Sequence, residues 1–215
     1  MTGSINASTT GSKEELLAGP LTNETWLPIS REEARAANNN YISYCSAKKE
    51  GELAIWDFVK TASPKFTVTV FLPALIFGPP IQPVKGGVKG LNYSSKAVYG
   101  LIDGSAAEVP ATTFPSYIDV RDLADAHVRA LTEPRVAGKR LNVGGHPLTY
   151  TALAHALAKV PELAGRVPKD SGEDANVAPA RIDASEANEA LGLTFRSLDQ
   201  TAADTARRLL ELEKA

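Results

Sequence analysis

The feature that most constrains the fold is the run FTVTVFL at residues 66–72, which is rich in β-branched and aromatic side chains. Proline stands on both sides of this run, at Pro64 and Pro73. Its length and composition predict a strand that is buried on both faces, as in a parallel sheet covered by helices. The longest apolar stretch, residues 68–77, is far shorter than the ~18–20 residues that span a bilayer. We therefore expect a buried strand and no membrane anchor.

Helices are expected on both sides of this strand, where apolar residues recur at three- and four-residue steps. The first covers residues 41–62 and follows asparagines that suit a helix N-cap. A short strand is expected at residues 140–143. The other expected helices lie near residues 91–102, between Asp119 and Pro134, and at residues 150–160, 184–191 and 198–213. This order of helices and strands, with short connections, predicts an α/β layer architecture.

Two of these helices begin with the spacing of a capping box. Asp183 and Glu186 open one of them, and Ser197 and Gln200 open the last one. In a capping box, each of the two side chains accepts a hydrogen bond from the backbone N–H of the other residue. The two pairs therefore predict defined helix starts.

The charge balance argues against a partner that is a polyanion. The sequence has 23 Lys and Arg residues against 25 Asp and Glu residues, so its formal net charge is -2. No long-range field would draw such a chain to nucleic acid or to an anionic membrane. One cysteine and three histidines supply neither a disulfide framework nor a cysteine-and-histidine zinc site, and the first residues lack the pattern of a secretory signal. We expect a cytoplasmic protein that binds no metal.

Tyr44 and Lys48 stand four residues apart on the first expected helix, so their side chains share one face. An ammonium close to a phenol favours the phenolate, because the opposite charges attract. The pair can therefore give and take a proton near neutral pH. On spacing alone, an ordinary surface or packing pair is the alternative interpretation.

Seven motifs occur along the chain in the order that one known family shows. The motifs are TGSINAS, YCSAKKEGELAIWDF, FLPALIFGPP, LNYSSKAVYGLIDG, YIDVRDLADAHVRAL, GKRLNVGG and LGLTFRSLDQTAADTARRLL. Any one motif is weak, but the ordered set covers nearly the whole chain. On these motifs the sequence resembles the extended branch of the short-chain dehydrogenase/reductase superfamily, and within it the fungal NADPH-dependent aldehyde and ketone reductases.

The resemblance implies an α/β fold, namely the C-terminal part of a Rossmann-type parallel sheet with a small, mostly helical substrate-binding region. Residues 1–215 would form a single partial domain. Residues 1–77 and 117–145 would belong to the Rossmann part, and residues 78–116 and 146–215 to the substrate-binding part. The family's fold begins with a strand and a GxxGxxA turn that binds the pyrophosphate, and this sequence contains no GxxGxxA.

The resemblance also implies an activity, the reduction of a small aldehyde or ketone by hydride transfer. Ser4 would hydrogen-bond the substrate carbonyl oxygen, and Tyr44 would donate the proton to it. Lys48 would favour the ionised form of Tyr44 and hydrogen-bond the ribose of the nicotinamide cofactor. The oligomeric state does not follow from the resemblance.

The cofactor implied by the relatives is NADPH, with NADH as the alternative. In the family, the backbone at Pro73, Ala74 and Ile76 lines the nicotinamide, and Ser94 approaches the phosphates. Tyr44 and Lys48 belong to the same expected cofactor site.

Two other functions remain open. Because the sequence lacks the glycine motif, the chain could be a non-enzymatic remnant, or a half-domain that a partner chain completes. A nucleotide-sugar epimerase or dehydratase is the third possibility, since those enzymes share the YxxxK pair. A Ser-His-Asp hydrolase is not expected, because the sequence has no GxSxG turn.

Other reactive residues have ordinary structural interpretations. His127 is expected to pack on its helix and His146 to lie in a turn, whereas Cys45 is expected to be buried and neutral. A group of charged residues is expected to cap a helix and to form surface ion pairs. Its members are Asp119, Arg121, Asp122 and Asp125.

Overall fold

The computed structural model describes residues 1–214, and its longest element is helix α3 (Asn40–Ala62). The helix starts at Asn39, whose side-chain oxygen accepts hydrogen bonds from the backbone N–H groups of Tyr41 and Ile42. It ends at Ser63, which adopts a left-handed conformation with φ of 44°. Such a residue stops helical hydrogen bonding. The first helix expected from the sequence is therefore confirmed.

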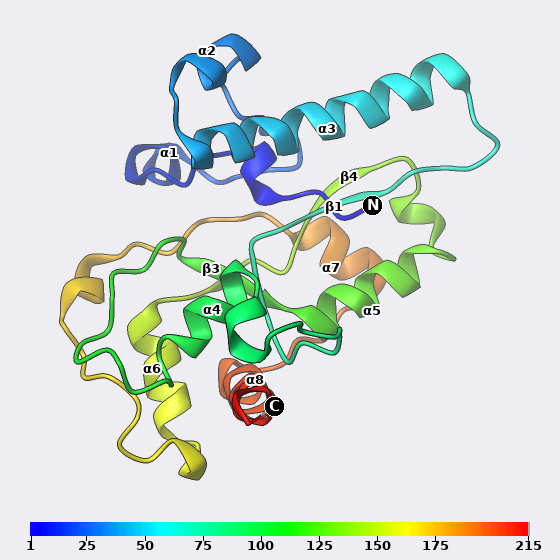
Figure 1. Ribbon diagram of the computed structural model, residues 1–215. Coiled ribbons are helices and arrows are strands. Elements are labelled where there is room, and N and C mark those ends of the chain that lie inside the picture. The colour runs from blue at the N-terminus through cyan, green and yellow to red at the C-terminus, as the bar shows by residue number, and fades with distance from the viewer. Residues whose placement is uncertain (215) are drawn as a thin grey trace. The chain divides into compact units, whose positions relative to one another are not determined.

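The chain packs as two units, each assembled from segments that are distant in sequence (Figure 1). The first unit comprises Met1–Ala74, Leu123–Gly145 and Ala180–Thr194. The second comprises Leu75–Asp122, His146–Pro179 and the segment that starts at Phe195. The expected division into Rossmann and substrate-binding parts remains a prediction.

In the first unit, strand β1 (Val70–Pro73) pairs in parallel with strand β4 (Arg140–Val143). Thr2 forms a parallel bridge to Phe71 of β1, so the start of the chain extends this sheet. All four residues of β1 are buried, which confirms a strand covered on both faces. The N-terminal bound of the predicted strand is wrong, because β4 begins opposite Val70 and residues 66–69 do not extend this ladder. Phe66 is accordingly 61% exposed.

Helices flank this pair of strands. Ser30 and Glu33 form a capping box at the start of helix α2 (Arg31–Ala36), which packs against α3, and such a cap contributes about 1 kcal/mol. The buried core includes Ala7, Val70 and Leu72, with Trp56 packed against it. The remaining helical elements of this unit are η1 (Ile5–Ala7), α1 (Lys13–Ala18), η3 (Pro134–Val136) and α7 (Ser185–Leu191), and α5 (Val120–Ala130) begins in the second unit and continues here.

The capping box expected at Asp183 and Glu186 is wrong. Helix α7 begins after Ala184, and no side chain caps it. The Glu186 carboxylate instead accepts hydrogen bonds from Lys139 Nζ and Asn23 Nδ2, at 2.6 Å and 2.7 Å. Both donors come from distant parts of the sequence, so the local pattern could not reveal them.

In the second unit, β2 (Leu75–Phe77) and β3 (Ser116–Asp119) are parallel, and β5 (His146–Pro147) is antiparallel to β3. His146, expected in a turn, therefore lies in a short strand. Helices α6 and α8 pack together in an apolar core that includes Leu157 and Leu209. The helical elements are η2 (Gly87–Gly90), α4 (Tyr93–Tyr99), α6 (Tyr150–Ala158), η4 (Pro161–Leu163), η5 (Glu173–Asn176) and α8 (Leu198–Glu213). The expected α/β fold is confirmed.

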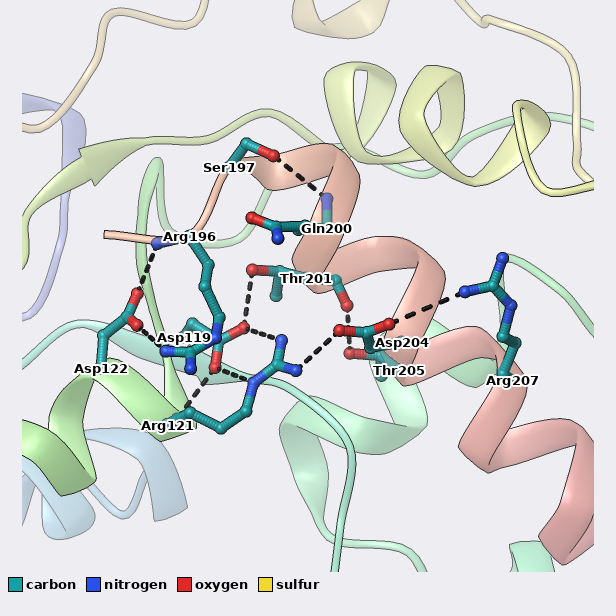
Figure 2. A network of polar contacts seen from close by, with 10 residues as sticks. All are labelled: Asp119, Arg121, Asp122, Arg196, Ser197, Gln200, Thr201, Asp204, Thr205 and Arg207. Atoms are coloured by element: carbon teal, nitrogen blue, oxygen red, sulfur yellow. Dashed lines mark hydrogen bonds and ion pairs between the residues drawn. The ribbon is translucent and has the colours of Figure 1, made fainter. Parts of the chain in front are cut away.

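A buried charge network joins β3 to α8 within the second unit (Figure 2). The Asp119 carboxylate is buried and accepts hydrogen bonds from Arg121 Nη2 at 2.7 Å and from Thr201 Oγ1 at 2.7 Å. Arg121 also pairs with Asp204 at 2.6 Å. Burial raises the pKa of Asp119, but the hydrogen bonds from Arg121 and Thr201 outweigh burial and hold it below its usual value.

The expectation of surface ion pairs is wrong for the two innermost members of that cluster. Asp119 and Asp122 are each 1% exposed. Asp122 accepts a hydrogen bond from the backbone N–H of Arg196 at 2.9 Å. It also forms an ion pair with the guanidinium of Arg196. Both aspartates therefore link segments inside the second unit.

Candidate active site

Ser4 stands at the start of the short helix η1 in the first unit. Its backbone is extended, with φ of -163° and ψ of 146°, and its side chain caps η1 by accepting a hydrogen bond from the backbone N–H of Asn6 at 3.2 Å. Only 7% of Ser4 is exposed. Its hydroxyl also contacts Asn6 Oδ1 at 3.4 Å, near the long limit for a hydrogen bond.

Tyr44 and Lys48 lie on α3 in the same unit, one turn apart. The Lys48 Nζ is 5.7 Å from the centre of the Tyr44 ring, which is within the range of a cation–π contact. Tyr44 is 46% exposed and Lys48 is half-buried. Within residues 1–214, neither the phenol oxygen nor the ammonium has a hydrogen-bond partner, so both groups are available to a ligand.

A hydrogen bond connects η1 with α3 next to these groups. Asn6 Nδ2 donates to Tyr41 Oη at 2.8 Å, and Tyr41 Oη donates to the carbonyl oxygen of Thr10 at 2.8 Å. Tyr41 is one turn before Tyr44, so the two phenols share a face of α3. Helix α3 also packs directly against η1. The structure thus brings Ser4, Tyr44 and Lys48 into one unit on two elements that are in contact.

Cys45 is fully buried beneath this surface, as expected. Burial raises the pKa of its thiol, and hydrogen bonds involving Tyr41 and Asn6 partly offset that effect. The thiol therefore stays neutral near pH 7 and contributes packing rather than nucleophilic chemistry.

The other predicted cofactor residues are divided between the two units. Pro73 is buried at the end of β1, and Ala74 follows it at the boundary of the first unit. Ile76 is a half-buried residue of β2 in the second unit. Ser94 is half-buried in the first turn of α4, also in the second unit. Their roles toward a cofactor remain predictions.

Two further observations concern partners. None of the helices in residues 1–214 combines the length and the apolar character that crossing a bilayer requires. Across the same residues, the structure shows no group of three or more His, Cys, Asp or Glu side chains placed to hold a metal ion.

Known proteins similar to this chain are fungal reductases. The NADPH-dependent methylglyoxal reductase of Saccharomyces cerevisiae is 34% identical over 196 residues, which are 88% of this chain and 56% of the relative. A ketoreductase of Aspergillus niger is 33% identical over 175 residues, which are 79% of this chain and 51% of the relative. The solved structure of yeast methylglyoxal/isovaleraldehyde reductase complexed with NADPH matches 99% of this chain and 63% of its own, with a TM-score of 0.80 and 30% identity. No protein-family model matches the sequence.

The chain is similar to the extended short-chain dehydrogenase/reductases. It spans about half the length of the curated relatives it matches. These relatives confirm the resemblance inferred from the ordered motifs. The roles of Ser4, Tyr44 and Lys48 are proposals, developed below.

Asn6 and Tyr41 were not among the residues predicted for the site. A signal for Tyr41 was present, because positions 41, 44 and 48 follow the three- and four-residue steps of one helix face. No comparable signal marked Asn6. Its amide reaches Tyr41 across 35 positions of sequence, and only the packing of η1 on α3 brings the two together.

Proposed function

We propose that this chain carries the proton-transfer site of an NADPH-dependent reductase that converts a small aldehyde or ketone to the alcohol. The observation that carries the proposal is the arrangement in the first unit. The Tyr44 phenol and the Lys48 ammonium lie together, without competing hydrogen bonds in residues 1–214, on a helix that packs against the element bearing Ser4. The names of the relatives support the reaction class, since they are NADPH-dependent methylglyoxal reductases and a ketoreductase.

In this proposal each residue acts on the carbonyl oxygen or beside it. Ser4 donates a hydrogen bond to that oxygen as negative charge develops on it, and Tyr44 transfers its phenolic proton to it. The positive charge of Lys48 stabilises the phenolate that Tyr44 becomes. A general acid of this kind contributes about 10²–10⁴-fold to the rate.

The donor chemistry fits a nicotinamide dinucleotide. When bound, NADPH supplies the hydride that reaches the carbonyl carbon. The Lys48 ammonium has three donors that no acceptor in residues 1–214 occupies, so it can hydrogen-bond ribose hydroxyls. Ser94 offers a hydroxyl in the first turn of α4 of the second unit, and its role toward a phosphate remains a prediction. The sequence contains no GxxGxxA turn, so the proposal assigns no residue of this chain to the pyrophosphate.

Two measurements test the proposal on the chain as it exists. The first is a titration with NADPH, followed by calorimetry and by the fluorescence of Trp26 and Trp56, with an expected Kd of about micromolar, near -8 kcal/mol. The second is the rate of NADPH oxidation with methylglyoxal and with a series of small aldehydes and ketones. We expect Tyr44→Phe to lower kcat by about 100-fold or more and to leave the Kd for NADPH nearly unchanged.

A matched variant separates chemistry from folding. Tyr99→Phe removes a phenol oxygen that donates to Glu213 at 2.8 Å in the second unit. We expect it to keep the wild-type kcat. If folded wild-type chain neither binds NADPH nor oxidises it with any carbonyl, or if Tyr44→Phe turns over like the wild type, the proposed function is wrong.

A further inference from the structure

We propose that Asn6 is a positioning residue for this reduction, because it holds the Ser4 hydroxyl and ties η1 to the turn of α3 that precedes Tyr44. The inference rests on the proposed function and adds to it a residue that the YxxxK pair does not reveal. It follows from three hydrogen bonds of one side chain and its backbone.

The first step concerns the Ser4 hydroxyl. Its oxygen accepts from the Asn6 backbone N–H at 3.2 Å, and its proton points to Asn6 Oδ1 across 3.4 Å. The first bond fixes the oxygen. The second is long, so the proton is only weakly held. Ser4 can therefore redirect its hydrogen bond from Asn6 Oδ1 to a substrate oxygen while its own oxygen stays in place.

The second step concerns the helix that carries Tyr44. Asn6 Nδ2 donates to Tyr41 Oη at 2.8 Å and also to the Thr9 carbonyl at 3.3 Å. Tyr41 Oη in turn donates a hydrogen bond to the Thr10 carbonyl at 2.8 Å. One amide thus contacts the serine and the face of α3 that Tyr41 shares with Tyr44.

The third step concerns the loop that receives this chain of hydrogen bonds. The Glu15 carboxylate accepts from the backbone N–H and the hydroxyl of Thr10, at 2.7 Å and 3.0 Å, and from the hydroxyl of Thr9. The Thr10 carbonyl that Tyr41 contacts is therefore on a loop that is itself anchored. If Tyr41 moved, its hydrogen bond to the Thr10 carbonyl would break, because Glu15 holds the Thr10 loop in place.

Loss of the Asn6 amide should affect the orientation of the reacting groups more than the stability of the fold. Asn6 is half-buried and Tyr41 is 47% exposed, so water replaces much of what a lost hydrogen bond removes. A misplacement of reacting groups by about 1 Å can nevertheless cost ~100-fold in rate. We infer that removal of the Asn6 amide affects catalysis more than folding.

The test compares Asn6→Ala with Asn23→Ala in the full chain. Asn23 is a half-buried asparagine of the same unit, whose amide donates to Glu186 at 2.7 Å and accepts from the backbone N–H of Asn142 at 2.8 Å. Within residues 1–214 it forms no hydrogen bond with Ser4 or α3. For Asn6→Ala we expect kcat for the best carbonyl substrate to fall about 10- to 100-fold, with KM for NADPH unchanged within about twofold. For Asn23→Ala we expect the wild-type kcat even where the unfolding midpoint falls.

Tyr41→Phe tests the link to α3 separately, because it keeps the ring and removes the oxygen that joins Asn6 to Thr10. We expect a smaller loss of kcat than with Asn6→Ala, and a double variant no worse than Asn6→Ala, since both changes break one chain of hydrogen bonds. Additive losses in the double variant would overturn the proposed coupling. A wild-type kcat in Asn6→Ala would overturn the inference altogether.

A readout independent of turnover separates this inference from the proposed function. Carbon-13 labelling at tyrosine Cζ gives one signal for each ring, and Tyr44→Phe assigns the signal of Tyr44. We expect Asn6→Ala to shift the Tyr44 signal and Asn23→Ala to leave it in place. If the wild-type chain shows no turnover, the proposed function fails, and the Tyr44 signal is then the only test of whether Asn6 positions Tyr44. An unmoved Tyr44 signal in Asn6→Ala would overturn the inference.

Discussion

The guanidinium Nε of Arg140 lies 2.8 Å from Oε1 of Glu52, and the side chains of these residues are 9% and 0% exposed. Glu52 is one turn after Lys48 on α3, and Arg140 begins β4, so the pair anchors the helix of the candidate site to the sheet. Trp56 Nε1 donates to the same oxygen at 3.1 Å, and the Arg140 guanidinium stacks 4.0 Å from the centre of the Trp26 ring. These contacts of one carboxylate oxygen link α3 to β4 within the first unit.

Breaking this buried pair should be costly. Glu52→Gln removes the negative charge and leaves the Arg140 guanidinium uncompensated, so we expect a loss of about 3–5 kcal/mol in the free energy of unfolding. Urea unfolding followed by tryptophan fluorescence measures it. Glu186→Gln is the control, because the Glu186–Lys139 pair is exposed and should be worth less than about 1 kcal/mol. If both variants lost the same free energy of unfolding, burial would not be the reason for the high cost of Glu52→Gln.

The second unit should depend on Asp119 in the same way. Asp119→Asn removes one of the two carboxylate partners of Arg121 and leaves only Asp204. We expect a loss of about 3 kcal/mol in the free energy of unfolding, against little change for the exposed Asp125→Asn. Because the folded-state pKa of Asp119 is below its usual value, its ionised form stabilises the fold above about pH 4 and this contribution disappears as the pH falls through the folded pKa. Unfolding in guanidinium chloride from pH 3 to 7 should show a steeper dependence on pH in the wild type than in Asp119→Asn.

Mild acid should destabilise the second unit through His146. Its ring packs 4.4 Å from the Phe195 ring and 5.8 Å from the Tyr117 ring, measured between centres. Burial lowers its pKa from the ordinary 6.5, while Asp122 opposes this. The unfolded chain therefore binds a proton first, so stability is intact above pH 6.5 and declines as the pH falls below it. Unfolding free energies measured between pH 8 and pH 5 should show the decline.

Two histidine variants identify the source of that decline. Within residues 1–214 the buried Nε2 of His146 has no hydrogen-bond partner, so His146→Phe keeps the ring packing without losing a bond at that atom. We expect His146→Phe to flatten the pH dependence in part. His127, a residue of the first unit, also has a pKa lowered by burial, so His127→Phe should remove the part of the decline that comes from that unit. A full wild-type slope in His146→Phe would contradict the assignment to the second unit.

Gly78 should tolerate no side chain. Its φ is 139°, and a Cβ at this position would lie 2.5 Å from Cγ1 of Val120. Gly104 also has a positive φ, of 78°, but a Cβ there would meet nothing within 4 Å. We expect Gly78→Ala to cost about 1–3 kcal/mol more than Gly104→Ala in thermal unfolding, because steric overlap adds to backbone strain. A partial recovery by Val120→Ala in the Gly78→Ala background would locate the overlap.

Much of the secondary structure could be predicted because it depends on local patterns. Asn39 caps α3 with its own side chain, and Ser197 caps α8 by accepting from Gln200, three residues on. Helix α5 and strand β4 were expected where the structure has them, since periodicity and flanking residues mark both. The same local reasoning failed at Asp183 and Glu186, where partners distant in sequence take the carboxylate that a capping box would use.

Some residues of the candidate site could likewise be predicted from local spacing, and others could not. Tyr44 and Lys48 were predictable as neighbours, because four residues of helix place two side chains on one face whatever surrounds them. The motif order also identified the family before any fold was known. Ser4 was assigned through that family, since nothing in the flexible-looking run TGSINAS marks a capped and buried hydroxyl.

The sequence by itself therefore determined the longer helices, the buried parallel strand and the resemblance to a family of reductases, because each depends on residue types at short, regular spacings. Tertiary structure alone decided that Asp119 is buried, that Glu52 pairs with Arg140, and that Asn6 contacts Tyr41. The physical reason is that burial and hydrogen-bond partners depend on which segments pack together. That packing joins residues 35 to 88 positions apart, which no local pattern encodes.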